Sequence, residues 1–131
     1  MLRAVERVVG TLDEALDLEA LARGAALYHD DPETTPAAEL RSDAALVVPA
    51  DLCLPPGVAE AFLPAGRYAK TTHRGAYSGL GDAWARLMGG WLPRSGFRVG
   101  AGPTYELYVN DPRTTDTDDL LTDLCLPLAG A

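Results

Sequence analysis

One long stretch of the chain carries apolar residues at helical spacing. The apolar positions fall on one face of a helix with 3.6 residues per turn. They are Tyr77, Leu80, Trp84, Leu87, Met88 and Trp91. This pattern predicts a helix over about 78–92, with Pro93 and Gly96 placed to end it.

A shorter helix, the first along the chain, is predicted near its start. Thr11 and Glu14 form a capping box, in which each side chain satisfies a free backbone N–H of the first turn. Gly24 is placed to end this helix. The segment available to it is about half as long as the one around the other helix, so one wall of any groove between the helices is expected to be low.

Short apolar runs bounded by turn residues predict six strands. The segments are 2–9, 25–29, 44–48, 67–72, 105–109 and 124–128. Each helix therefore follows one strand and precedes two others. This order predicts an α+β fold.

An internal repeat relates the two halves at an offset of 80 residues. Asp-Pro-Glu-Thr-Thr at 31–35 recurs as Asp-Pro-Arg-Thr-Thr at 111–115, and 7 of the 18 aligned pairs between 31–48 and 111–128 are identical. The Asp-Pro-x-Thr-Thr segment is predicted to be a turn between two strands. A period this long indicates a duplicated half-domain rather than a solenoid.

The repeat predicts one domain with internal pseudo-twofold symmetry. We expect a single domain over 1–131, with copy one at about 1–49, a linker over 50–57 and copy two at about 58–131. Two strand–helix–strand–strand units should pair in one antiparallel sheet, with both helices on one face. The groove between the helices is then the natural ligand site.

Composition narrows the classes of function. The net charge of −8, from 19 acidic and 11 basic residues, disfavours direct nucleic-acid binding. No apolar run is long enough to span a membrane, and the first residues lack a secretory signal, so a cytoplasmic protein is expected. Cys53 and Cys125 fit no zinc pattern and are expected to be reduced thiols. No sequence motif indicates a cofactor.

Four segments of copy two together resemble a known bacterial family. They are Leu-Pro-Ala-Gly-Arg-Tyr at 63–68, Thr-His-Arg-Gly-Ala-Tyr at 72–77, Trp-Leu-Pro-Arg-Ser-Gly-Phe at 91–97 and Tyr-Glu-Leu-Tyr-Val-Asn-Asp-Pro at 105–112. They are specific only in combination. In that combination the chain resembles the GyrI-like small-molecule-binding domain, which is also the effector-binding domain of many AraC-type regulators.

The resemblance implies a groove that binds lipophilic, often cationic, compounds. Such a domain would act by sequestration, sensing or antibiotic resistance. Some stand-alone members resemble hydrolases that open cyclopropane-bearing antibiotics, and others act as antitoxins or modulators of DNA gyrase. This chain has no helix-turn-helix segment, so a sensing role would need a DNA-binding partner in a separate chain.

Glu106 is the main candidate for chemistry, because the resemblance implies that a glutamate on this central strand contacts the ligand. Strand alternation places Glu106 on one face with Tyr108. Its counterpart in copy one is Ala26, so the fold itself does not require a carboxylate here. If buried among aromatic rings, Glu106 would hold a cation or act as a general acid/base. The alternative is a solvent-facing glutamate on a half-buried strand.

Aromatic side chains are the candidate walls of the groove, because they stack on flat or cationic ligands. The candidates are Tyr28, Tyr68, Tyr77, Trp84, Trp91 and Tyr108. An apolar helical stripe is more often core than ligand site. On this ground Trp84 is expected in the core and Trp91, near the helix end, in the groove.

Other polar residues give weaker signals. His73 has no nucleophile partner nearby in the sequence, and His29 with the adjacent aspartates lacks a metal-ligand spacing. The acidic run at 116–119 is expected to be a solvated turn.

Three functions stay open at this point. The favoured one is a binding module for a lipophilic, cationic small molecule, with Glu106 as the polar anchor. The second is a hydrolase in which Glu106 serves as the general acid/base of the same pocket. The third is an interaction protein that modulates gyrase through its acidic surface. A homodimer that completes the groove also stays open, because a short copy one would expose apolar surface.

Overall fold

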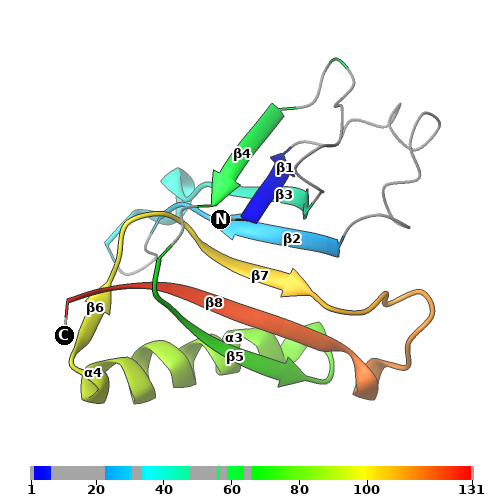
Figure 1. Cartoon of the computed structure of the whole chain (residues 1–131). Coiled ribbons are helices and arrows are strands. Elements are labelled where there is room, and N and C mark those ends of the chain that lie inside the picture. The colour runs from blue at the N-terminus through cyan, green and yellow to red at the C-terminus, as the bar shows by residue number, and fades with distance from the viewer. Residues whose placement is uncertain are drawn as a thin grey trace.

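The protein has an α+β fold in which one long helix packs against a curved antiparallel sheet (Figure 1). The computed structural model describes residues 2–6, 23–30, 34–47, 56, 59–63 and 66–130. The predicted first helix lies outside these residues, and so does most of the predicted linker over 50–57.

The sheet is antiparallel throughout, and seven strands form its continuous path. Across the sheet they are β4 (Ala59–Leu63), β1 (Leu2–Glu6), β3 (Ser42–Val47), β2 (Arg23–Tyr28), β7 (Thr104–Tyr108), β8 (Leu121–Gly130) and β5 (Tyr68–Arg74). A short strand, β6 (Phe97–Val99), pairs with the last residues of β8, beyond the stretch that β5 covers.

Strands β2 and β7 meet at the centre of the sheet, and Ala26 lies directly opposite Glu106. Outward from this pair, the order β2, β3, β1 on one side matches β7, β8, β5 on the other. The two turns also match, because the backbone N–H of Arg41 donates to Asp30 and that of Leu121 donates to Asn110. The full pseudo-twofold relation stays a prediction, since the first helix is not among the described residues.

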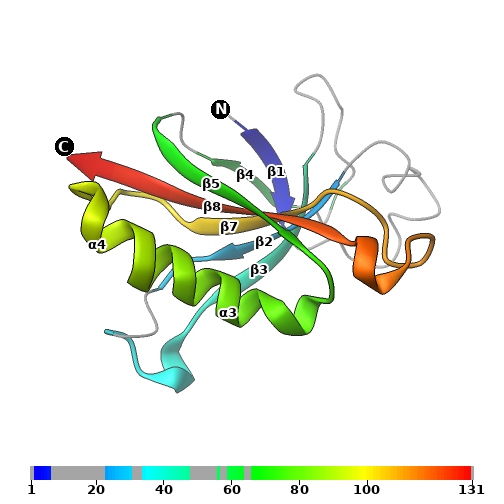
Figure 2. The ribbon, with the colours of Figure 1, turned by 90° about the horizontal axis from the view of Figure 1, so that it is seen from below.

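The helix runs from Tyr77 to Ser95 along one face of the sheet (Figure 2). It begins with a 3₁₀ turn, η2 (Tyr77–Gly79), and continues as α3 (Leu80–Ala85), a π-helical segment, η3 (Arg86–Trp91), and α4 (Leu92–Ser95). The helix predicted over 78–92 is therefore present, and it extends about one turn beyond the predicted end.

The helix ends at Gly96 and not at Pro93. Pro93 lies in the first turn of α4, directly after the π-helical segment, and the helix continues through it to Ser95. Gly96 adopts a left-handed conformation, with φ at 81°, and Ser95 caps the end by accepting from the Phe97 N–H.

Gly24 was expected to end the first helix, and this expectation is wrong, because Gly24 lies in β2 opposite Leu46. A Cβ at this position would lie 3.4 Å from the ring of Tyr108. The ring of Tyr108 therefore packs over the central strand at this position.

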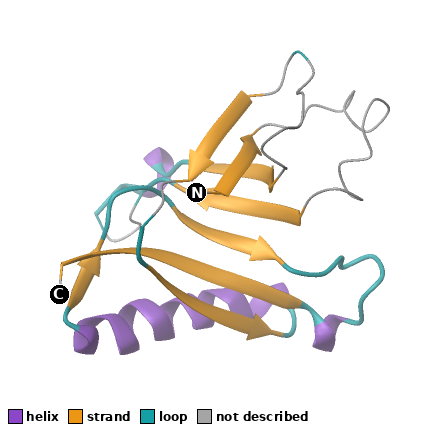
Figure 3. Ribbon diagram, viewed as in Figure 1, coloured by secondary structure: helices purple, strands orange, loops and turns teal. Residues whose placement is uncertain are grey.

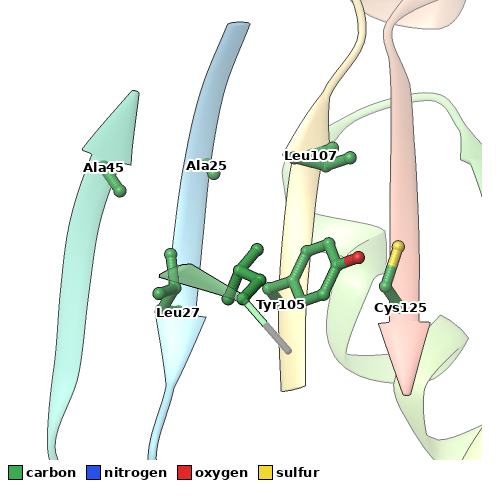
Figure 4. Packing of buried hydrophobic residues seen from close by; sticks show 7 residues of the cluster. Ala25, Leu27, Ala45, Tyr105, Leu107 and Cys125 are labelled. Atoms are coloured by element: carbon green, nitrogen blue, oxygen red, sulfur yellow. The ribbon is translucent and has the colours of Figure 1, made fainter. Parts of the chain in front are cut away.

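Each face of the sheet carries its own apolar cluster. The helix side buries Leu80, Ala83, Leu87, Leu124 and Leu126. The other side buries Ala25, Leu27, Ala45, Leu63, Tyr105, Leu107 and Cys125, which Figure 4 draws as sticks. Because both faces of the sheet are buried, the sequences of the central strands are nearly continuous apolar runs.

Strands β4 and β6 were not predicted, and β8 is twice as long as the segment over 124–128 (Figure 3). Strand β4 pairs along the whole of β1, and β6 pairs with the last three residues of β8. Segments of three to five residues carry too little periodicity to be recognised alone, and the pairing partner determines them.

Candidate functional site

Glu106 lies in the middle of β7 with only 3% of its surface exposed. Its neighbours in the ladder are Ala26 of β2 and Leu124 of β8. Tyr105 and Leu107 point to the opposite face, as the alternation predicts. The carboxylate therefore projects to the helix side of the sheet, and the solvent-facing alternative is wrong.

Three side-chain donors meet the Glu106 carboxylate. The Tyr28 hydroxyl donates to Oε1 at 2.6 Å, and the Trp84 indole N–H donates to the same oxygen at 3.3 Å. The Tyr108 hydroxyl lies 3.5 Å from Oε2. No lysine, arginine or histidine of the described residues contacts the carboxylate, so these donors leave its charge uncompensated.

The carboxylate lines a cavity of about 690 Å³. Its walls come from β2, the start of β3, β7 and the helix, so residues of both predicted copies meet around it. The rings of Tyr77 and Tyr108 pack with their centroids 5.3 Å apart. Leu40 also lines the cavity although 42% of its surface is exposed. A cavity of this size and aromatic lining suits a small organic ligand.

An ion pair lies at the solvent end of this cavity. The Arg41 guanidinium donates to both carboxylate oxygens of Asp30, at 3.0 and 3.1 Å. This bidentate contact lowers the pKa of Asp30 and raises that of Arg41. The two charges offset one another, so Glu106 supplies the unpaired charge of the cavity.

The phenols around Glu106 stay protonated at neutral pH. Burial, followed by the hydrogen bond to Glu106, raises the pKa of Tyr28 far above its usual value. Burial and the Glu106 charge raise the pKa of Tyr108 to about 12. Both hydroxyls therefore remain available as hydrogen-bond donors to the carboxylate.

We expect this arrangement to give the fold a marked sensitivity to alkali. A tyrosine whose pKa is about 12 when folded and about 10 when unfolded holds its proton more tightly in the native state. Its contribution to the free energy of unfolding is therefore complete below pH 10 and is lost as the pH rises toward 12. Urea unfolding at pH 9, 10 and 11 should show a falling free energy of unfolding, with a shallower fall in Tyr108→Phe.

The comparison variant is Tyr68→Phe, because the Tyr68 ring lies on the other face of the sheet, where burial, followed by Cys125, raises the pKa of Tyr68 without a contribution from Glu106. Its effect on the alkaline slope should be smaller than that of Tyr108→Phe. If Tyr108→Phe leaves the alkaline slope unchanged, the phenol does not share the buried environment of the carboxylate.

Five of the seven predicted ligand-binding residues line this cavity. They are Tyr28, Tyr77, Trp84, Glu106 and Tyr108. Trp84 was expected in the core; it packs against the Leu124 cluster and also presents its indole N–H to Glu106.

Tyr68 and Trp91 lie elsewhere. Tyr68 packs edge-on against Tyr105, with ring centroids 5.6 Å apart, on the face away from the helix. Trp91 stacks against Phe97, and its side chain borders a different cavity. The structure therefore does not bring either ring to Glu106.

Several lining residues were missed by the sequence reasoning. Leu40 and Arg41 follow the Asp-Pro-x-Thr-Thr turn of copy one, and Thr104 begins β7. Met88 lies on the predicted helical stripe and could have been proposed from it. Its flexible thioether suits a wall that adapts to different ligands.

The remaining candidates make local contacts. The imidazole of His29 lies 2.6 Å from the Asp43 carboxylate, and His73 lies 3.0 Å from the carbonyl oxygen of Ala76. Within the part of the chain that the structure describes, no group of three His, Cys, Asp or Glu side chains is placed to hold a metal.

The acidic run at 116–119 forms a 3₁₀ turn, η4 (Thr117–Asp119). Its last residue, Asp119, pairs with Arg74. The described residues include no helix long and apolar enough to cross a bilayer.

Comparison with known sequences gives one family. The profile of the GyrI-like small molecule binding domain matches residues 12–129. A protein of Yersinia enterocolitica named DNA gyrase inhibitor is 41% identical over 98 residues, which cover 72% of this chain and 62% of the relative. A DNA gyrase inhibitor of Erwinia billingiae is 32% identical over 108 residues, which cover 80% of this chain and 68% of the relative. The chain thus spans about two thirds or less of the length of these relatives.

Solved structures show the same fold at low sequence identity. The protein EcmrR in a DNA complex superposes with a TM-score of 0.74 at 16% identity, over 99% of this chain and 54% of EcmrR. The isolated EcmrR C-terminal domain gives 0.69 at 17% identity, over 99% of this chain and 92% of that domain. A hydrolase from Listeria innocua gives 0.60 at 15% identity, over 83% of this chain and 63% of the hydrolase.

Proposed function

The chain belongs to the family of GyrI-like small molecule binding domains, and from this premise we propose that it binds a lipophilic cation in the cavity around Glu106. The observation that carries the proposal is a buried carboxylate without a cationic partner among the described residues. Taking such a charge out of water is costly unless another charge approaches it. A bound cation would supply that charge.

The walls of the cavity support an apolar, flat ligand. Tyr77, Trp84 and Tyr108 offer ring faces or edges on the helix side, and such rings attract cations that have lost their water. The apolar side chains of Leu80 and Met88 extend this surface. A strongly hydrated small cation would gain little from these contacts, whereas an aromatic or alkylated ammonium would gain from both the rings and the carboxylate.

The proposal is tested by calorimetric titration with a panel of aromatic cations and their uncharged, isosteric analogues. We expect the cations to bind and the neutral analogues to bind much more weakly. Equal affinity for both members of each pair would contradict a role for the carboxylate. Mass spectrometry of the recovered compound separates the two uses of the site, because an unchanged compound indicates a binding module and a hydrolysed one indicates an enzyme.

Sequestration and sensing both fit such a module. A sensing role would require a DNA-binding protein as partner, since the described residues contain no element that reads DNA. In EcmrR, a structure of the same fold forms part of a protein that binds DNA.

A second candidate is inhibition of DNA gyrase, favoured by the 41% identity to the Yersinia protein of that name. We expect the purified chain, if it acts in this way, to reduce supercoiling of relaxed plasmid by gyrase in proportion to its concentration. Glu106→Gln tests whether the cavity takes part, since a surface interaction would leave that variant fully inhibitory. Unchanged supercoiling at a large molar excess of the chain would remove this candidate.

A further inference from the structure

A second cavity, of about 620 Å³, lies between β5 and the helix. One wall is β5 from Ala69 to Arg74. The other wall is helical, and its apolar part consists of Ala83, Leu87 and the indole of Trp91. Trp91 is 43% exposed, so the apolar part of this cavity is open to solvent. None of these residues hydrogen-bonds to Glu106.

Strand β5 is the last strand on this side of the sheet, and β8 is its only partner in the described structure. The N–H of Leu128 donates to the carbonyl of Arg67, and the N–H of Gly75 donates to the carbonyl of Leu120. In an antiparallel ladder, hydrogen-bonded pairs occur at every second residue. The odd-numbered residues of β5 therefore bond to β8, and the backbone groups of Tyr68, Lys70, Thr72 and Arg74 point to the open edge.

The open edge is basic although the whole chain carries a net charge of −8. Lys70, Arg74 and Arg86 border this cavity, and no acidic side chain does. Lys70 pairs with the buried Asp123, and Arg74 pairs with the exposed Asp119. Arg86, which lies on the helical wall, has no ion-pair partner among the residues described here, so the cavity as a whole keeps a positive excess.

This charge pattern disfavours pairing of β5 with a second copy of itself in the register centred on Thr72. A twofold axis through Thr72 would place Lys70 of one copy opposite Arg74 of the other. Like charges directly opposite one another destabilise a strand pair. The same charges would attract an acidic strand.

We propose that the open edge of β5 binds an extended acidic peptide segment of another protein, which adds a strand to the sheet. Alternate side chains of that strand would lie beside Lys70 and Arg74, where carboxylates are favoured. The side chains between them would enter the cavity toward Leu87 and Trp91, where apolar groups are favoured. The recognised sequence therefore alternates acidic and apolar residues.

The test uses a fluorescent, capped peptide of alternating Glu and Val, as long as the seven residues of β5. We expect saturable binding by fluorescence anisotropy and no binding of the peptide with Lys in place of Glu. Amide chemical shifts should change along β5 and at the Trp91 indole. Equal binding of the two peptides, or shifts confined to other surfaces, would overturn the proposal.

A matched pair of variants isolates the backbone contact. Thr72→Pro and Thr72→Ala both lose the hydroxyl that donates to Asp123 at 2.6 Å, but only proline also removes the N–H that points to the open edge. Proline is tolerated there because this N–H does not bond to β8. We expect Thr72→Pro to bind the peptide roughly tenfold more weakly than Thr72→Ala. Equal affinity of the two would show that no strand is added.

A second pair isolates the charge. Arg74→Glu reverses a charge at the edge, and Arg94→Glu makes the same change on an exposed helix residue outside the cavity. We expect about a tenfold loss in Arg74→Glu and little change in Arg94→Glu. Light scattering tests whether a second copy of this chain occupies the edge instead of the peptide. A dimer that is present in the wild type and lost in Thr72→Pro would assign the edge to that copy and overturn the proposal.

Discussion

Glu106→Gln is expected to weaken the binding of a lipophilic cation by about a hundredfold. Glutamine keeps the size of the side chain and still offers an oxygen to Tyr28 and Trp84, whose donors meet Oε1 in the wild type. The change therefore removes the charge and little else. Because the carboxylate is only 3% exposed, water cannot replace the lost attraction. Calorimetric titration of both proteins with the same aromatic cation measures the ratio of dissociation constants.

The control for this variant is Asp30→Asn, which removes one negative charge from the solvent end of the same cavity. Its effect on cation affinity should be small, because water screens this end and Asp30 is already paired with Arg41. The affinity of a neutral analogue should be nearly the same in wild type, Glu106→Gln and Asp30→Asn. Similar losses in the two variants would mean that the cation senses the overall charge of the cavity rather than the buried carboxylate.

Leu124→Ala is expected to lower the free energy of unfolding by about 3 kcal/mol. Leu124 is fully buried, lies beside Glu106 in the ladder and packs with Leu87 under the helix. Removing three carbon atoms there leaves a cavity that the rigid central strands cannot fill by relaxing. Urea denaturation at neutral pH measures the change, and a melting temperature lower by roughly 10 °C should accompany it.

Leu40→Ala is the matched control, because the same atoms are removed from a side chain that is 42% exposed. We expect a loss of less than about 0.5 kcal/mol there. If Leu124→Ala also lowers the free energy of unfolding by so little, the position of the helix does not depend on this part of the sheet. The walls of the Glu106 cavity would then not be fixed as described.

The pattern of the sequence predicted the α+β class, the helix over Tyr77–Ser95 and the face of β7 that carries Glu106. These features depend on local periodicity, which a single sequence contains. The position of Tyr68 depends instead on how β5 aligns with β8, where Tyr68 lies opposite Pro127. Most of β5 is polar or small on both faces, so its sequence does not indicate which face is buried.

The sequence pattern did not predict, for a different reason, that the Trp91 ring borders another cavity. The helical stripe was counted with 3.6 residues per turn, but residues 86–91 form a π-helical segment, which holds an extra residue in its turn. Each side chain beyond such a segment is displaced around the axis by one residue's rotation, about 100°. Met88 consequently faces the Glu106 cavity, whereas Trp91 faces the cavity beside β5.

The direct pairing of Ala26 with Glu106 limits how such a site can arise. In a dimer of two identical half-chains, a twofold axis between the central strands would place the same residue at both positions. Two glutamates there would be buried opposite one another, and both could not be ionised without a large penalty. A single continuous chain escapes this constraint, because a mutation in one half is not copied into the other. In the predicted pseudo-twofold arrangement, the lone carboxylate breaks the symmetry of the two copies, and a single chain permits this because its two halves differ in sequence.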